Sequence, residues 1–439
     1  MSEFYEIGND RELFIDDELS CSREGLEFKL HRPVEQAADP GKPNGHYLTL
    51  MKHPGGYRMY YRGISPAYTG VIKNGNPGEF TGVAESADGL HWSEPDLGLY
   101  PGEPVPPGTI LYRKVYNHNF VPFYDDRPGI PEEERYKAVA GIMETGGLIT
   151  FVSSDGIRWN RLSEGVIIPY ETEAFGGHSL DSQNIVFYSE VEKCYVIYFR
   201  VWKTSDGRTK LRTFAKITSP DFRHWGEIEF LNPNMPDEHL YVSGFFPYWR
   251  APQLYVGAAT RFFAKHGAAT DITLLFSRRG RGVLRPFPGA WITPGLDEER
   301  WGDRMNYIAY HMFPISPEKI GLYLGMKSIL YTLRTDGFIS LSAGLTAGTW
   351  CSKVLKYTSG RLQFNLSTSA GGAFRVGLYA PDGAALPGYA LEECDEFYGD
   401  RIAFEPTWGG RKHEIAPGTL LRLKIEMKEC DLYSFGFSI

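Results

Sequence analysis

The chain has 439 residues, of which 42% are hydrophobic and 23% charged, a composition that excludes an intrinsically disordered protein. Its formal net charge is −8 and no dense Lys/Arg cluster interrupts the sequence, which argues against nucleic acid or an anionic membrane surface as a partner. Aromatic residues reach 14%, beside 49 glycines and 29 prolines, which indicates many short strands joined by tight turns.

One turn recurs along most of the chain. The turn at Glu85–Trp92 is repeated at Ser153–Trp159 and Thr218–Trp225, and less complete copies lie at Phe276–Gly280 and Leu333–Phe338. The marker positions 88, 155, 221, 279 and 336 lie 67, 66, 58 and 57 residues apart, a spacing typical of a repeat architecture. Asp-Gly favours a hairpin turn, and each copy follows a β-rich run. The repeat predicts five four-stranded sheets that close a five-bladed β-propeller, with the Asp holding each turn and the Trp packing between blades.

After Gly337 the residue pattern of the sequence changes. Runs at 374–379, 420–425 and 432–437 alternate at strand period, and about a hundred residues of this kind predict a β-sandwich. We therefore expect an all-β chain, with a five-bladed catalytic propeller at residues 1–343 and an accessory C-terminal β-sandwich at residues 344–439.

Polar residues that begin the inner strand of a blade are the first candidates for a site, because these strands line the central channel. In the first blade Asp16 and Asp17 are adjacent, so they point to opposite faces of a strand. In the third blade Asp181 and Asn184 begin the inner strand, and His178 is near enough to add a ligand contact. The alternative for these acids is a structural role in a turn.

The other blades offer a weaker set of candidates. In the fourth blade Glu238 stands close to Tyr241; aromatic faces stack on sugars, and an apolar surround raises a carboxyl pKa so that the group can act as an acid. In the second blade Asn117 and Asn119 carry amides that both donate and accept hydrogen bonds, as sugar hydroxyls require. His311 is the candidate of the fifth blade, with a core histidine as its alternative.

The sequence lacks the signatures of other chemistries and of export. No Walker A, dinucleotide-binding, HExxH, G-x-S-x-G or zinc-type cysteine pattern occurs, so we expect no cofactor and no metal. The first residues lack a basic and an apolar region, and no run of 18 apolar residues exists. The five cysteines are odd in number and widely spread. We expect reduced thiols and a cytoplasmic location.

Several segments resemble the five-bladed propeller glycosidases, especially proteins grouped with glycoside hydrolase family 32. They are Arg11–Asp17, the Ser-x-Asp-Gly-x-x-Trp turns, Arg334–Leu341 and Asp431–Phe435. The resemblance implies retaining hydrolysis by a nucleophilic Asp, a stabilising Asp and a general-acid Glu. By position these are Asp17 (or Asp16), Asp181 and Glu238.

The sequence departs from that family at the same three places. The first-blade Asn-Asp-Pro-Asn-Gly segment is absent, the third-blade Arg-Asp-Pro reads Leu180-Asp181-Ser182, and the fourth-blade Glu-Cys reads Glu238-His239. Fructan specificity is therefore not expected.

The predicted function is hydrolysis of a glycosidic bond of a carbohydrate by paired carboxylates in the central pocket. A separation of about 5–5.5 Å between the carboxyl groups would indicate retention and about 6.5–9.5 Å inversion. One alternative is a non-catalytic sugar-binding propeller. A second is a phosphorylase or transferase, which needs a basic pocket for which Arg62, Arg200 and Arg250 are candidates. A third is a scaffold for protein partners.

Overall fold

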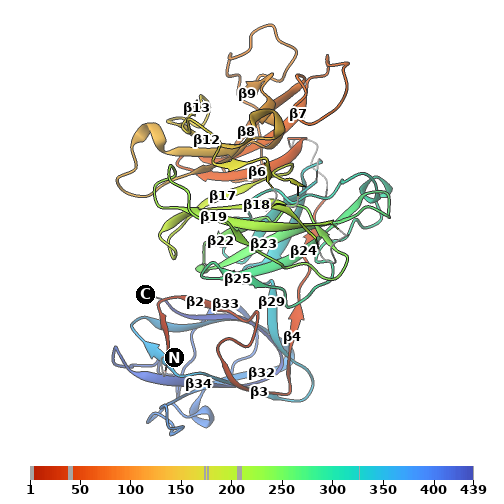
Figure 1. Ribbon diagram of the computed structural model, residues 1–439. Helices are drawn as coiled ribbons and strands as arrows, with labels where there is room; N and C mark the ends of the chain where they lie inside the picture. Colours follow the sequence, from red (N-terminus) through yellow and green to blue (C-terminus); the bar gives the residue numbers. More distant parts are fainter. Residues whose placement is uncertain are drawn as a thin grey trace.

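The computed structural model describes residues 4–37, 43–172, 175, 177–204, 210–325 and 327–438. Its elements are strands and short 3₁₀ turns, arranged as a propeller with a smaller β-sandwich beside it (Figure 1). The predicted all-β class and the five-bladed propeller are confirmed. No helix in the described ranges is long and apolar enough to cross a membrane.

Each blade is an antiparallel sheet whose strands follow one another from the channel outward. Blade one contains β6 (His46–His53), β7 (Gly56–Ile64), β8 (Glu79–Ser86) and β9 (Thr109–Tyr112). Blade two contains β10 (Val121–Tyr124), β11 (Tyr136–Ala140), β12 (Gly147–Ser153), β13 (Asn160–Arg161) and β14 (Ile168–Pro169). Blade three contains β17 (Ile185–Ser189), β18 (Cys194–Thr204), β19 (Lys210–Ser219) and β20 (Glu229–Phe230). Blade four contains β21 (His239–Leu240), β22 (Phe245–Tyr248), β23 (Ala251–Phe263), β24 (Ala269–Arg278) and β25 (Arg281–Leu284).

Blade five closes the ring with strands from two distant parts of the chain. It contains β26 (Phe313–Pro314), β27 (Lys319–Leu324), β28 (Ile329–Arg334) and, as its outer strand, β5 (Val34–Glu35). Next to the channel, Leu50 and Tyr310 join blades one and five, because the amide of Leu50 donates to the carbonyl of Tyr310 at 2.9 Å.

Smaller elements connect the blades. They are the strand pair β15 (Glu171–Thr172) and β16 (Gly177–His178) and the 3₁₀ turns η1 (Val115–Asn119), η2 (Glu132–Glu134), η3 (Met143–Thr145), η5 (Glu298–Trp301) and η6 (Leu391–Glu393).

The repeated turns lie where the repeat predicts them, after the third strand of each blade. In blade one, Asp88 Oδ1 accepts the amides of Leu90 and His91 at 2.8 and 2.9 Å. The backbone bond from His91 is the largest cause of a strongly lowered pKa at Asp88. Trp92 crosses to blade five, where its Nε1 donates to the hydroxyl of Tyr323 at 3.1 Å. The turn residues therefore stabilise the blades.

The sandwich takes strands from both ends of the chain, which corrects the predicted domain boundary. Its C-terminal part contains β29 (Ile339–Ala343), β30 (Gly348–Ser352), β31 (Leu355–Tyr357), β32 (Arg361–Tyr379), β33 (Asp400–Phe404) and β34 (Leu420–Ser438). Its N-terminal part contains β1 (Tyr5–Gly8), β2 (Arg11–Leu13), β3 (Ser20–Glu24) and β4 (Leu26–Leu30), which pair with β31, β34, β30 and β29. Red N-terminal and blue C-terminal strands lie together in Figure 1. The propeller thus begins after β4, so residues 5–30 do not belong to it.

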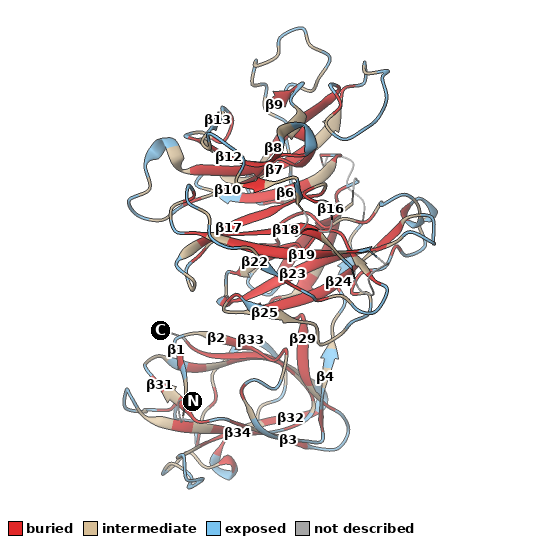
Figure 2. Cartoon of the chain, in the orientation of Figure 1, coloured by how far each residue is buried: buried red, intermediate tan, exposed pale blue. Residues whose placement is uncertain are grey.

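Each body has its own apolar core. Val121, Ile185 and Phe245, on the inner strands of blades two to four, are fully buried, as are Phe364 and Leu423 in the sandwich. Figure 2 shows the buried residues along the strands and the exposed ones in the loops. The inner strands are therefore rigid supports, and groups at their ends are held in fixed positions.

Candidate functional site

The N-terminal ends of the inner strands bring a group of charged and aromatic side chains together. We call this group the charged mouth, and it is joined by ion pairs, ring contacts and cation–π contacts. Its members are Tyr47, Arg62, Glu79, His118, Asp181, Arg200, Arg212, Tyr241 and Tyr307. All five blades contribute, so the group surrounds the channel axis.

Asp181 stands on a tight turn directly before β17. Leu180 is buried and has a φ of 62°, a left-handed conformation that is costly for a leucine. Asn119 and Asn184 both donate from Nδ2 to the carbonyl of Leu180, at 3.0 and 3.1 Å. Asn184 also donates to the carbonyl of Ser182 at 3.1 Å. These two asparagines, predicted to contact substrate, instead hold the turn that presents Asp181.

The Asp181 carboxylate is partly open and faces His118 and Arg200. Its side chain is 23% exposed; Oδ1 lies 3.6 Å from His118 Nε2, and Oδ2 lies 3.5 Å from Arg200 Nη2. Asn74 donates to Oδ1 as well. Burial opposes ionisation, but the contact with His118 and the charge of Arg200 outweigh it and hold the pKa of Asp181 below its usual range. Without a ligand the group is therefore a carboxylate at neutral pH.

His118 links this open carboxylate to a buried one. Its Nδ1 lies 3.0 Å from Glu79 Oε1 and 2.6 Å from Arg62 Nη1. Glu79 is only 2% exposed. A carboxylate behind an imidazole fixes the ring, so that Nε2 stays directed at Asp181. Asn117 and Asn119 were predicted as site residues from the sequence, whereas His118, which lies between them, was not.

Two arginines from neighbouring strands of blade three share one aromatic ring. The guanidinium carbons of Arg200 and Arg212 lie 4.9 and 5.2 Å from the ring centre of Tyr241. Tyr241 is 7% exposed and also contacts the ring of Tyr307. The structure therefore brings the predicted residues Arg200 and Tyr241 to the same place as Asp181.

Glu238 does not reach the charged mouth, which corrects its predicted role beside Asp181. Its carboxylate accepts bonds from Arg285 Nη1 at 2.5 Å and Nη2 at 2.8 Å, and Arg261 lies 3.8 Å away. The amide of Met235 adds a bond at 3.0 Å. A carboxylate with this many donors is structural, since both of its oxygens are used.

Asp16 and Asp17 lie outside the propeller, because their segment pairs with the sandwich. Asp17 is half exposed and pairs with Arg23 at 3.1 Å. Asp16 accepts bonds from Arg278 at 2.8 and 3.0 Å, across the junction between sandwich and blade four. The three predicted acids therefore do not share a pocket, and the paired-carboxylate prediction fails for Asp17, Asp181 and Glu238.

Three more predicted residues have other positions. Asn117 is buried and donates to the carbonyl of Glu79 at 2.9 Å, so it supports β8. Arg250 bonds to the buried Asp336 at 2.9 Å, at the junction with the sandwich. The side chain of His178 lies outside the described residues.

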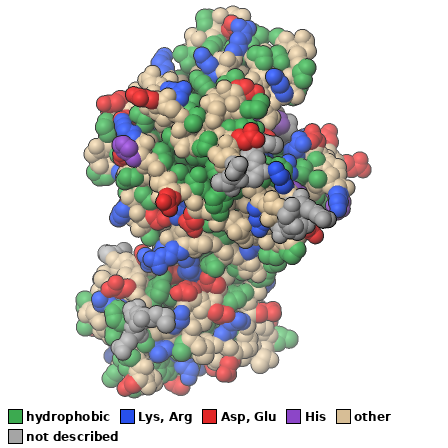
Figure 3. Space-filling model, viewed as in Figure 1, with side chains coloured by type: hydrophobic (Ala, Val, Ile, Leu, Met, Phe, Trp, Pro, Cys, Tyr) green, Lys and Arg blue, Asp and Glu red, His purple; other side chains and the backbone are tan. Residues whose placement is uncertain are grey.

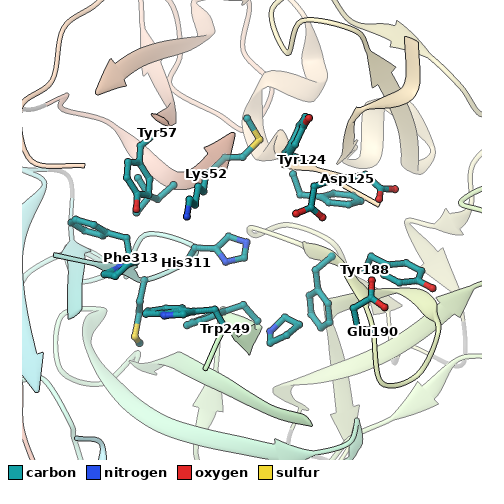
Figure 4. A pocket seen from close by; sticks show the side chains of 18 of the residues that line it. Lys52, Tyr57, Tyr124, Asp125, Tyr188, Glu190, Trp249, His311 and Phe313 are labelled. Atoms are coloured by element: carbon teal, nitrogen blue, oxygen red, sulfur yellow. The ribbon is translucent and has the colours of Figure 1, made fainter. Parts of the chain in front are cut away.

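The opposite end of the channel holds a different pocket, the aromatic mouth, and His311 belongs to it. A cavity of about 400 Å³ lies at the C-terminal ends of the inner strands. Figure 4 shows its side chains around an open centre, among them Tyr57, Tyr124, Tyr188, Trp249 and Phe313. Burial lowers the pKa of His311 to about 3, so this histidine is neutral at physiological pH.

Figure 3 shows acidic and basic side chains interspersed on the face in view. Within the described residues, no group of three His, Cys, Asp or Glu side chains is placed to hold a metal ion. In sequence, Asp39 stands shortly before β6, as Asp181 stands before β17; it lies outside the described residues.

The fold and this site define a five-bladed propeller with a charged group at one channel mouth. No protein-family model and no curated protein matches the sequence. Among solved structures, the chain is similar to a glycoside hydrolase family 43 arabinoxylan arabinofuranohydrolase from Bacillus subtilis in complex with cellotetraose (13% identity, TM-score 0.43, covering 91% of this chain and 96% of that one).

Two further solved structures are similar. One is a β-1,2-mannobiose phosphorylase from Listeria innocua in complex with β-1,2-mannobiose (12% identity, TM-score 0.46, 70% of this chain and 97% of that one). The other is a GH32 β-fructofuranosidase from Bombyx mori (9% identity, TM-score 0.39, 93% and 94%). The blade count rests on the strand pairing of this chain.

Proposed function

We propose that the protein is an enzyme that cleaves a glycosidic bond at the charged mouth, with Asp181 as its acid–base group. The observation that supports this most is the position of Asp181. Of the three predicted acids it alone lies at the channel mouth, partly open, on a strained turn that two buried asparagines hold. A structural carboxylate needs no such presentation.

The surroundings of Asp181 suit a sugar. The rings of Tyr47 and Tyr307 are half-buried at the mouth and offer apolar faces to the C–H groups of a pyranose or furanose. Arg200 and His118 flank the carboxylate and supply donors for hydroxyl groups. The Asp181 carboxylate takes a proton from a water molecule whose oxygen bonds to the anomeric carbon, and gives that proton to the glycosidic oxygen as the bond from that oxygen to the anomeric carbon breaks. His118 then holds the resulting carboxylate.

The test compares Asp181→Asn with a matched variant, Asp126→Asn, in which the same change is made to an exposed carboxylate at the aromatic mouth. Wild type and variants are incubated with a panel of oligosaccharides and aryl glycosides, and sugar release and sugar binding are measured separately. We expect Asp181→Asn to lower kcat by about 10²–10⁴-fold, the usual contribution of an acid–base group, with binding changed only a few-fold. Asp126→Asn should behave as wild type.

Two outcomes would contradict the proposal. If wild type binds sugars but cleaves none, the protein is a sugar-binding propeller. If Asp181→Asn cleaves as fast as wild type, the acid–base group lies elsewhere.

A further inference from the structure

Arg200 is buried, and its guanidinium has no hydrogen-bond acceptor among the described residues. The side chain is 1% exposed, and Nε, Nη1 and Nη2 make no hydrogen bond to any residue that the structure describes. Within the described part of the chain, its one ion pair is the 3.5 Å contact with Asp181. A guanidinium has five N–H donors, and buried donors without acceptors are costly. The donors of Arg200 are therefore unmatched among the residues that the structure describes.

Two more arginines stand close to Arg200. Arg212 shares the Tyr241 ring with it, and burial followed by the charge of Arg200 lowers the pKa of Arg212. Arg62 enters from blade one, beside His118. Nε of Arg62 and of Arg212 also make no hydrogen bond to a described residue. Three cations thus converge from two blades on one short stretch of the channel.

The carboxylates of the charged mouth do not balance these cations. Asp181 and Glu79 carry two negative charges against the three positive charges of Arg62, Arg200 and Arg212. Burial, and then the positive charge of Arg62, lower the pKa of His46 to about 4. A bound anion would remove this excess and accept the unused N–H groups, and oxyanions match the fork of a guanidinium.

We infer that Arg200, Arg212 and Arg62 form an oxyanion subsite beside Asp181, which accepts either inorganic phosphate as a co-substrate or the carboxylate of an acidic sugar. The inference rests on the proposed cleavage of glycosides and specifies what that reaction takes in. Both ligands present paired oxygens to a guanidinium; they differ in whether the anion reacts or only anchors the sugar.

With phosphate in the subsite, cleavage is phosphorolysis. An oxygen of HPO₄²⁻ forms a bond to the anomeric carbon while the bond from that carbon to the glycosidic oxygen breaks. Protonated Asp181 gives its proton to the leaving oxygen, and the phosphate proton then passes to the Asp181 carboxylate. The products are a glycosyl phosphate and a free hydroxyl, with no water consumed. A phosphate beside Asp181 also favours the protonated carboxyl, because a second negative charge opposes ionisation.

The test measures anion binding without catalysis. Inorganic phosphate, and separately galacturonate as a representative hexuronate, are titrated by calorimetry at constant ionic strength. The proteins are wild type, Arg200→Gln, Arg200→Lys and the matched control Arg223→Gln. Arg223 belongs to the same blade but is 44% exposed and pairs with Glu134. We expect one anion to bind wild type and the control equally, at least tenfold more weakly to Arg200→Gln, and with intermediate affinity to Arg200→Lys.

A second variant, Arg212→Gln, is needed because Arg200 is fully buried and its substitution can disturb the fold. It should weaken the same anion, and circular dichroism confirms that each variant is folded. If neither anion binds wild type more tightly than the folded variants, the subsite is refuted. Binding of phosphate, with glycosyl phosphate detected by ³¹P NMR, supports the co-substrate; binding of galacturonate alone supports the acidic sugar and refutes phosphorolysis.

The result separates the inference from the proposed function. Anion binding that depends on Arg200, without cleavage of any glycoside, supports the subsite and refutes the enzyme. Cleavage that depends on Asp181, without anion binding, supports the enzyme and refutes the subsite.

Discussion

The two mouths of the channel hold aspartates in opposite circumstances. At the aromatic mouth, Asp125 accepts bonds from Arg127 at 2.8 and 2.9 Å and from Tyr195 at 2.8 Å, and the buried Lys137 lies 3.2 Å away. At the charged mouth, Asp181 accepts a bond from Asn74 and lies 3.5 Å from Arg200 and 3.6 Å from His118, and the guanidinium of Arg200 makes no hydrogen bond to a described residue.

The difference indicates how to separate structural charges from functional ones in this fold. A buried carboxylate whose oxygens are all used stabilises the protein, and its removal leaves an unpaired charge behind. A charge that the fold leaves partly unused has capacity for a ligand. Substitutions of Asp125 and Asp181 test this contrast.

The largest expected effect on stability comes from Asp125→Asn. It leaves Lys137, which is 1% exposed, without a carboxylate, and breaking such a buried pair costs about 3–5 kcal/mol. Asp181→Asn should lower the free energy of unfolding by less than Asp125→Asn does, because the contacts of Asp181 with Arg200 and His118 are longer, at 3.5 and 3.6 Å, and its side chain is 23% exposed. Urea unfolding of both variants measures this. A larger loss for Asp181→Asn than for Asp125→Asn would reverse the assignment.

Glu238→Gln should have an intermediate effect. It weakens the paired bonds with Arg285, and hydrogen bonds to charged groups contribute about 1.5–3 kcal/mol. Cleavage activity should stay within about twofold of wild type, since Glu238 does not reach the charged mouth. Asp17→Asn, at a half-exposed pair, serves as the control for a carboxylate without a role. A loss of kcat at Glu238→Gln comparable to that of Asp181→Asn would restore Glu238 as the general acid.

The smallest effect concerns pH. Burial raises the pKa of Asp125, but Arg127, Lys137 and Tyr195 outweigh it and leave the pKa below its usual value. The folded pKa is thus below the unfolded one, near about 3.9, so the stability from Asp125 is complete above that pH and is lost as pH falls below it. The gap in unfolding free energy between wild type and Asp125→Asn should therefore narrow by up to about 1.4 kcal/mol per pH unit below about pH 3.9. Urea midpoints at pH 7 and pH 3 measure it, and an unchanged gap would contradict the paired state of Asp125.

The five blades could be predicted from the amino-acid sequence alone. Each turn around Asp88, Asp155 and Asp221 is held by bonds to amides two or three residues away, so the whole motif is visible in a short stretch. Asp181 could also be identified as a candidate from the sequence, because it directly precedes a clear strand pattern. The cytoplasmic location and the absence of a cofactor stay predictions.

The domain boundary, the role of Glu238 and the composition of the charged mouth depend on tertiary contacts, because these contacts join residues that are far apart in the sequence. Residues 5–30 follow a strand pattern that either body accepts, and only their pairing with β29, β30, β31 and β34 places them in the sandwich. Glu238 is a candidate acid in sequence until Arg285, 47 positions further on, takes its oxygens. Glu79 and His118 come from blades one and two, so the packing of these blades beside blade three brings them to Asp181, whereas the pairing of β17 with β18 within blade three brings Arg200 to it. Local periodicity specifies strands and turns, whereas the chemistry of the mouth depends on which blade ends meet.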